Sequence, residues 1–263
     1  MMSVDSSHKY HNLTLAMGGT EQRLQLALGQ PGQNGVTLLA SREWTVPSQS
    51  LRFLTAGLKE TLDGFGVGAE AIDKIACVSG PGSFTGLRLV LAAAEGLAAG
   101  NGALLAGLDY LPLLASGPAP LINGTLHVLT YARRGLVYLQ SFTAPALDEI
   151  HPLTSYTLDE AAQRMATFDS NAYLMGSGLR KNPDFFATLA DKNQGYTLLP
   201  AQWDNPSPEL LLDAAVAATY SGDPIEPVYV RPTDAEDNLP QIAMKRGLDP
   251  DEARRRLDEL QKG

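Results

Sequence analysis

One segment restricts the fold more than any other: the sequence GPGSFTGLR at residues 80–88. It follows a short apolar run at residues 75–78, which predicts a buried strand, and it precedes an Ala- and Gly-rich stretch that predicts a helix to about residue 99. Three glycines within seven residues make the connection a tight turn. A strand, a tight turn and a helix in this order are the building unit of an α/β fold.

The same turn has two possible roles, and its spacing alone does not separate them. Backbone N–H groups at a helix N-terminus can bind an anion, typically a phosphate. Alternatively, the glycines permit close packing of the turn, and a hydroxyl group caps the helix. The pattern matches neither the P-loop nor the dinucleotide-binding motif. The candidate residues are Gly80, Gly82, Ser83, Thr85, Gly86 and Arg88.

The order of the other elements predicts two similar lobes. Three strands, a helix, a strand and a second helix are expected first, followed by a further strand. A similar order returns in the second half of the chain. We therefore predict an α/β, two-lobed, duplicated ribonuclease-H-like fold with any ligand between the lobes. The strands are expected at residues 13–17, 24–28, 36–40, 75–78, 103–108, 126–130, 136–142, 150–154 and 172–175, and the helices at 47–63, 84–99, 158–165, 185–190 and 209–220. The predicted domains are residues 1–108, 109–233 and a charged tail at 234–263.

Charge and cysteine content exclude several classes of protein. The 263 residues carry a formal net charge of −9, so the chain alone is a poor candidate for binding a phosphate backbone. Its single cysteine, Cys77, excludes an intrachain disulfide and thiolate-rich zinc sites, and is expected to be a core residue. The polar first residues and the lack of a long apolar run favour a cytoplasmic protein without a membrane span.

The chain also lacks the usual residue sets for catalysis. Its four histidines, His8, His11, His127 and His151, form no HxxxH pair, so we expect no metal. Ser83 has no histidine and acid nearby in the sequence to activate it. No cofactor is predicted.

Four segments together resemble the TsaB (YeaZ) family. They are GPGSFTGLR at 80–88, ARRGLVY at 132–138, LMGSG at 174–178 and PVYVR at 227–231. The resemblance implies an actin/Hsp70-like relative of TsaD that is not itself the catalyst. Such a protein pairs with TsaD, and with the ATPase TsaE, to attach a threonylcarbamoyl group to the adenosine beside the tRNA anticodon. It is expected to contact tRNA only through the complex, and to form a homodimer when alone.

Several positions depart from the family pattern. Where the family has Asp-Thr after its first strand, this chain has Gly18 and Gly19, and the segment Gln49-Ser50-Leu51 replaces His-Ser-Glu. Tyr131 and Leu136 stand where the family has acidic residues. Because a phosphotransferase needs carboxylates to hold Mg²⁺, nucleotide chemistry is disfavoured. The alternative is a divergent nucleotide-dependent transferase or a glycoprotease-like hydrolase.

The helix after the glycine turn is apolar on all sides, which requires burial on two sides. Its bulky face (Leu87, Val90, Leu91, Ala94 and Leu97) is expected to cover the chain's own sheet. Its small-residue face either packs on the preceding helix or binds a partner, and the family resemblance favours the partner. The predicted partner surface is Phe53, Ala56, Gly57, Leu89, Ala92, Ala93, Gly96 and Ala99.

Overall fold

The computed structural model describes residues 10–32, 35–45, 50–230, 243–247, 249–252 and 255–256. The chain divides into two compact units, Met1–Val228 and Tyr229–Gly263. In the second unit, Glu252 and Arg256 form an ion pair at helical spacing, with 2.5 Å between Glu252 Oε1 and Arg256 Nη2. All elements that follow belong to the first unit. The predicted domain limits at residues 108 and 233 remain a proposal.

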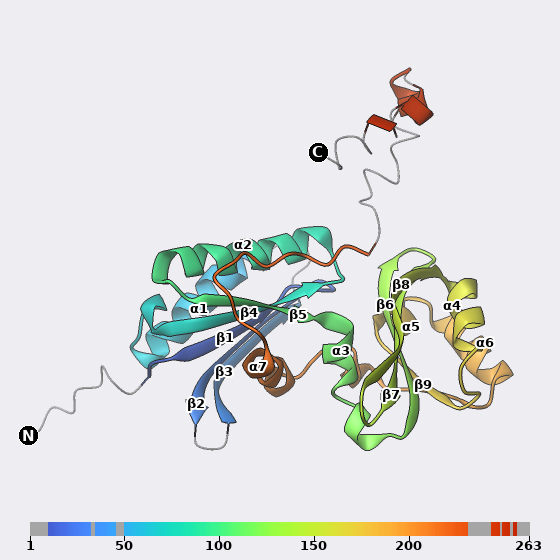
Figure 1. Cartoon of the computed structure of the whole chain (residues 1–263), viewed down its shortest axis with the longest axis horizontal. Coiled ribbons are helices and arrows are strands. Elements are labelled where there is room, and N and C mark those ends of the chain that lie inside the picture. Colours follow the sequence, from blue (N-terminus) through green and yellow to red (C-terminus); the bar gives the residue numbers. More distant parts are fainter. Residues whose placement is uncertain are drawn as a thin grey trace, which may run out of the picture. The chain divides into compact units, whose positions relative to one another are not determined.

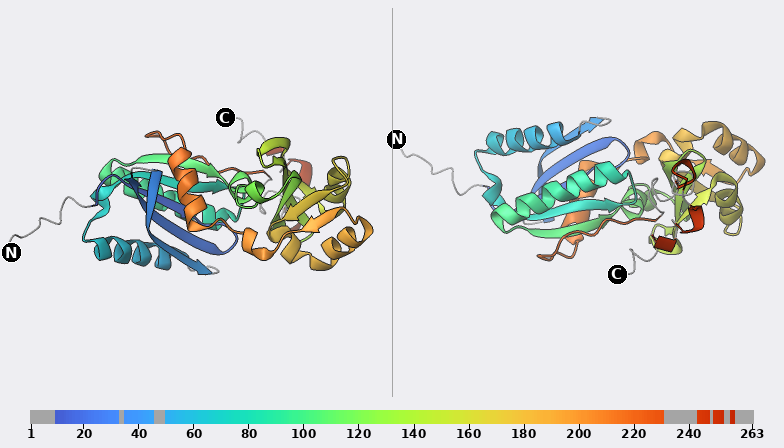
Figure 2. Two further views of the ribbon diagram at one scale, coloured as in Figure 1. Left: turned by 90° about the horizontal axis from the view of Figure 1, so that it is seen from below. Right: turned by 90° about the horizontal axis from the view of Figure 1, so that it is seen from above.

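The first sheet begins with three antiparallel strands, as predicted. They are β1 (Leu13–Gly18), β2 (Arg23–Gly32) and β3 (Gly35–Thr45). Two strands parallel to β1 complete the sheet, β4 (Ile72–Gly80) and β5 (Leu104–Asp109), in the order β3-β2-β1-β4-β5. The crossover helices α1 (Ser50–Phe65) and α2 (Phe84–Asn101) lie side by side on one face of this sheet (Figures 1 and 2).

The second sheet repeats this topology. Its strands are β6 (Gly124–Arg133), β7 (Leu136–Ala144), β8 (Asp148–Thr157), β9 (Ala172–Met175) and β10 (Tyr196–Leu198). Their order is β10-β9-β6-β7-β8, so the first strand is again central, with the antiparallel pair on one side and the parallel pair on the other. The helices between them are α4 (Leu158–Met165), α5 (Ser177–Lys181) and α6 (Pro183–Lys192). The predicted duplicated ribonuclease-H-like fold is confirmed.

Two helices connect the lobes by packing across them. Helix α7 (Pro208–Ala217) follows the second sheet in the chain but packs on β1, β2 and β3, on the face opposite α1 and α2 (Figure 2). Gly29 of β2 permits this approach, because a Cβ atom there would lie 2.4 Å from Leu212 Cδ2. Helix α3 (Tyr110–Ala115), which follows the first sheet, contacts β6 of the second. A helix that follows the second sheet in the sequence therefore packs on the first sheet, and a helix that follows the first sheet contacts the second.

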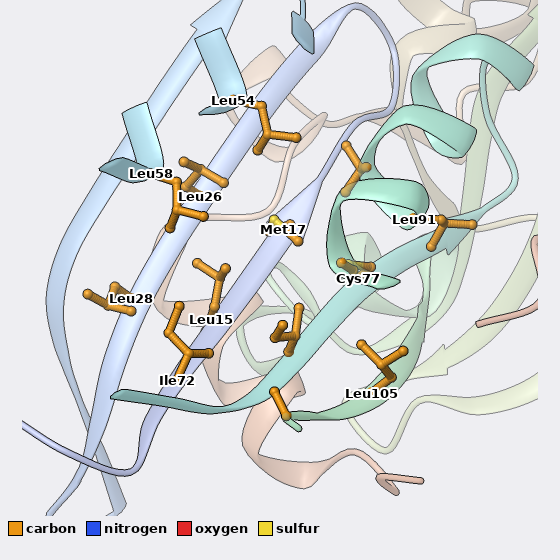
Figure 3. Close-up of a cluster of buried hydrophobic side chains, with 14 of the residues drawn as sticks. Leu15, Met17, Leu26, Leu28, Leu54, Leu58, Ile72, Cys77, Leu91 and Leu105 are labelled. Carbon is orange, nitrogen blue, oxygen red and sulfur yellow. The ribbon is translucent and has the colours of Figure 1, made fainter. Parts of the chain in front are cut away.

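The main hydrophobic core lies between the first sheet and α1 and α2 (Figure 3). Leu87, Val90, Leu91 and Ala94 of α2 are buried, as the predicted bulky face requires, and Leu97 is partly buried. Cys77 lies in the same core and is fully buried, which confirms it as a core residue. Burial raises the pKa of its thiol, so the reactive thiolate is disfavoured.

Candidate functional site: the glycine turns and the interlobe seam

The glycine turn at residues 80–88 is packed tightly against the chain around it. Gly80 has a left-handed φ of +128°, and a Cβ atom there would lie 2.9 Å from the carbonyl oxygen of Val228. A Cβ atom on Gly82 would lie 2.9 Å from Thr20 Cγ2. The tightest contact involves Gly86, whose Cβ atom would lie 2.3 Å from the carbonyl oxygen of Gly19. These contacts support the close-packing role of the glycines.

The polar residues of this turn face outward. Ser83 occupies the N-cap position of α2, but its hydroxyl group caps no backbone N–H within the described part of the chain. Ser83, Thr85 and Arg88 are exposed, and the Arg88 guanidinium lies over the Phe84 ring, 3.8 Å from its centroid. The structure brings the six predicted residues together, but it buries Gly80 and packs Gly82 and Gly86 against the loop that follows β1.

A second glycine turn precedes α5. Gly176 has a φ of +109°, and a Cβ atom there would lie 2.3 Å from the carbonyl oxygen of Leu129. Its backbone N–H donates a hydrogen bond to Asp204 Oδ1 over 3.1 Å, and Arg180 Nε donates to Asp204 Oδ2 over 3.0 Å. Burial raises the pKa of Asp204, against the opposing effect of the Arg180 charge. The Asp204 carboxylate thus accepts the hydrogen bond of the Gly176 N–H, which a phosphate bound at this turn would otherwise accept.

The connection between β1 and β2 carries an acidic residue that the sequence analysis did not identify. The Arg23 N–H donates to the Thr20 carbonyl over 2.9 Å and closes a turn around Glu21 and Gln22. Both of these residues are left-handed, with φ values of +53° and +64°. Glycine and asparagine are the usual residues at left-handed positions of a two-residue turn. Because Glu21 and Gln22 occupy these positions instead, the turn is strained.

Glu21 joins residues from both lobes. Its carboxylate accepts a hydrogen bond from the Ser177 hydroxyl group at the start of α5. Its second oxygen lies 3.5 Å from the hydroxyl oxygen of Tyr110 in α3. The pKa of Glu21 is raised to about 7, mainly by burial and also by the nearby Asp204 charge, against the opposing effect of its hydrogen bonds. We call Glu21, Tyr110, Ser177 and Asp204 the interlobe seam.

The raised pKa of Glu21 predicts a specific dependence of stability on pH. Because the folded state holds this proton more strongly than the unfolded state, whose carboxyl pKa is near 4.5, the free energy of unfolding falls as pH rises from about 4.5 to 7. The glutamine side chain in Glu21→Gln does not titrate, so this variant lacks the pH dependence that Glu21 contributes. We expect the stability of the wild type relative to Glu21→Gln to fall by about 2 kcal/mol between pH 5 and pH 8, measured by urea unfolding. Glu226→Gln at an exposed carboxylate is the control, and parallel pH profiles for wild type and Glu21→Gln would contradict the assignment.

The left-handed turn predicts a stabilising substitution. Gln22 is exposed at a φ of +64°, where glycine is favoured, so Gln22→Gly is expected to raise the free energy of unfolding by about 0.5–1 kcal/mol. Thermal unfolding should show a melting temperature about 2–3 °C higher. Thr37→Gly, at an exposed position of β3, should instead destabilise the protein, as glycine does inside a strand. A lower melting temperature for Gln22→Gly would contradict the account of the turn.

The predicted partner surface is only partly exposed. Ala56, Ala92, Gly96 and Ala99 are exposed, and no described atom outside the local helix backbone lies within 4 Å of the Cβ position of Gly96. Leu89 and Ala93 are half-buried, and Phe53 is half-buried beside Trp44, with ring centroids 6.1 Å apart. Gly57 does not contribute to this surface. It is buried, because a Cβ atom there would lie 2.3 Å from Trp44 Cη2.

Two of the four histidines, His127 and His151, are buried inside the protein. His127 is fully buried, with Nδ1 2.7 Å from Ser141 Oγ, and burial lowers its pKa to about 4. His151 is also buried, and its Nε2 lies 3.2 Å from the Tyr156 hydroxyl oxygen. His11 is exposed, and His8 lies outside the described residues. Among the residues that the structure describes, no group of three or more His, Cys, Asp or Glu residues is placed to hold a metal ion.

The structure describes only some of the positions that carry the family resemblance or depart from the family pattern. Tyr131 and Leu136 are half-buried, whereas Arg133, the last residue of β6, and Arg134, which follows it, are exposed. Gln49 and Arg231 lie outside the described residues. Within the described ranges, none of the helices has the length and apolar character needed to cross a membrane.

Comparisons with known proteins agree on one family. Residues 48–199 match the family model described as "TsaD: tRNA N6-adenosine threonylcarbamoyltransferase". A tRNA N6-adenosine threonylcarbamoyltransferase of Sorangium cellulosum is 33% identical over 192 residues, which are 68% of this chain and 51% of that protein. The chain therefore spans about half the length of that relative. The Escherichia coli tRNA threonylcarbamoyladenosine biosynthesis protein TsaB is 27% identical over 204 residues, covering 74% of this chain and 86% of that protein.

Two solved structures from Pseudomonas aeruginosa share the fold. A protein with similarity to peptidase YeaZ superimposes with a TM-score of 0.65 at 21% identity, covering 84% of this chain and all of that chain. YeaZ itself superimposes with a TM-score of 0.60 at 20% identity, covering 83% of this chain and 99% of that one.

Proposed function

Because this chain belongs to the TsaD family, as a member of its TsaB/YeaZ group, we propose that it acts as a non-catalytic pairing subunit in tRNA threonylcarbamoyladenosine biosynthesis. In this role it forms a heterodimer with a TsaD-like catalytic subunit and works with a TsaE-like ATPase. The complex attaches a threonylcarbamoyl group to the adenosine beside the tRNA anticodon. The chain alone would form a homodimer in the cytoplasm.

The observation that carries the pairing role is the exposed small-residue face of α2. Ala92, Gly96 and Ala99 leave this face without large side chains, whereas the opposite face of α2 is buried in the core. Small residues permit the backbone of another helix to approach closely, and the space at Gly96 is open among the described residues. Half-buried Leu89 and Ala93, with exposed Ala56 on α1, extend this surface.

A non-catalytic role is supported by the state of the two glycine turns. The first turn of α2 packs against Gly19, which together with Gly18 stands where the family pattern has Asp-Thr. At the second turn, Asp204 binds the Gly176 N–H and Glu21 binds Ser177. At the second turn, Asp204 and Glu21 therefore occupy two donors that a nucleotide phosphate could use, the Gly176 N–H and the Ser177 hydroxyl group, and both carboxylates are engaged in the chain's own contacts.

The alternative is a nucleotide-dependent transferase or a glycoprotease-like hydrolase that acts alone. Exposed Ser83, Thr85 and Arg88 at the first turn are the residues that favour it. Calorimetry with ATP and Mg²⁺ separates the two functions. Submicromolar binding, or turnover by the purified chain without partners, would contradict the pairing role.

Co-purification with the TsaD-like protein of the same host tests the proposal itself. We expect a stable 1:1 complex that forms in preference to the homodimer. The chain's net charge of −9 predicts that this chain alone binds tRNA only weakly at physiological salt. A chain that remains a homodimer in the presence of the TsaD-like protein would contradict the heterodimer.

A further inference from the structure

The hairpin between β1 and β2 places one acidic side chain in contact with the second lobe. Glu21 belongs to the first lobe, and Ser177, whose hydroxyl group donates to its carboxylate, lies 156 residues further along the chain. The second carboxylate oxygen faces the hydroxyl group of Tyr110 at 3.5 Å. A single side chain therefore contacts the start of α5 and the helix α3 that connects the two sheets.

The first-lobe side of this contact is preorganised. Glu21 and Gln22 are both left-handed, and the hydrogen bond from the Arg23 N–H to the Thr20 carbonyl holds the turn. Thr20 is buried at 4% exposure, so the turn is fixed at its base. Non-glycine residues persist in such a conformation only where surrounding contacts hold them there.

The second-lobe side is also fixed in its orientation. Ser177 Oγ accepts a hydrogen bond from the Tyr131 N–H over 2.9 Å, so its single proton is left for Glu21. The Tyr110 hydroxyl oxygen is buried and also lies 3.4 Å from the carbonyl oxygen of Asp204. Asp204 in turn binds Gly176 and Arg180. The contact thus belongs to a continuous hydrogen-bonded network.

Two-lobed proteins often close around a ligand that contacts both lobes. In this chain the Glu21 side chain, which belongs to the first lobe, takes the place of such a ligand by contacting Ser177 of the second lobe. We propose that Glu21 is a clasp that holds the two lobes together in the absence of any ligand, through Ser177 on one lobe and the strained β1–β2 turn on the other. This inference concerns the isolated chain and does not depend on the proposed pairing role.

A double-mutant cycle tests the clasp. Glu21→Ala and Ser177→Ala are each expected to lower the melting temperature of the isolated chain by about 4 °C. The double variant should lose less than the sum of the two single effects, because both substitutions remove the same hydrogen bond. Hydrogen exchange adds a readout across the lobes. The Tyr131 amide, in the second lobe, should exchange at least tenfold faster in Glu21→Ala, whereas Gln22→Ala on the same turn should leave it unchanged.

Two results would overturn the proposal. The first is additivity, in which the double variant loses the sum of both single effects. The second is faster exchange confined to the β1–β2 turn, with the Tyr131 amide unchanged. Should Glu21→Ala fail to fold, the same cycle with Glu21→Asp, which is one methylene group shorter, makes the same distinction.

Discussion

Gly86→Ala is expected to lower the free energy of unfolding by about 3 kcal/mol. The new methyl carbon would lie 2.3 Å from the Gly19 carbonyl oxygen, and this neighbour is backbone that cannot move aside without shifting α2 from the sheet. Overpacking of this kind costs about 1–3 kcal/mol and occasionally more. Urea unfolding of the purified variant measures the loss.

Gly96→Ala on the same helix is the matched control. No described atom beyond the local helix backbone lies within 4 Å of its Cβ position, and alanine has the higher helix propensity. This variant should therefore gain about 0.5–1 kcal/mol. Equal stabilities for the two variants would contradict the close-packing role of Gly86 and would restore the anion-binding role of the turn.

Gly96→Arg is expected to weaken pairing with the TsaD-like subunit by at least about 100-fold, equivalent to about 2.7 kcal/mol. The exposed position tolerates the side chain, so the stability of the isolated chain should change by less than about 0.5 kcal/mol. The arginine would project from the small-residue face and prevent close approach of another helix. Titration calorimetry against the partner measures the loss.

Ala187→Arg provides the control, because it adds the same charge to an exposed position of α6 in the other lobe. It should pair like the wild type. Phe53→Asp is unsuitable as a test, since Phe53 packs beside Trp44 and against the core. If folded Gly96→Arg pairs as tightly as Ala187→Arg, the partner surface lies elsewhere.

The regular elements were largely predictable from sequence periodicity. The predicted limits of β9 and α4 agree with the structure, and α2 begins at Phe84 as expected. The missed elements are short: α3 has six residues, α5 has five and β10 has three, fewer than a periodic pattern needs to be visible. The resemblance to the TsaB/YeaZ family is confirmed.

Contacts between distant segments could not be predicted in this way. Nothing in the order of elements indicates that α7 packs on the first sheet, because the contact at Gly29 depends on a leucine 183 positions later. Glu21 was missed for the same reason, since its partner Ser177 is remote in the sequence. The helical pattern also placed Gly57 on the outer surface, although the Trp44 ring from β3 covers it.

Reconstitution of the tRNA modification tests the central claim most directly. Substrate tRNA is incubated with ATP and a threonylcarbamoyl donor, together with the TsaE-like protein, and its nucleosides are then analysed by mass spectrometry. Threonylcarbamoyladenosine is expected only when this chain and the TsaD-like subunit are both present. Gly96→Arg should reduce the yield sharply, and Ala187→Arg should leave it unchanged. Modification by this chain without the TsaD-like subunit, or full activity of that subunit without this chain, would contradict the central claim.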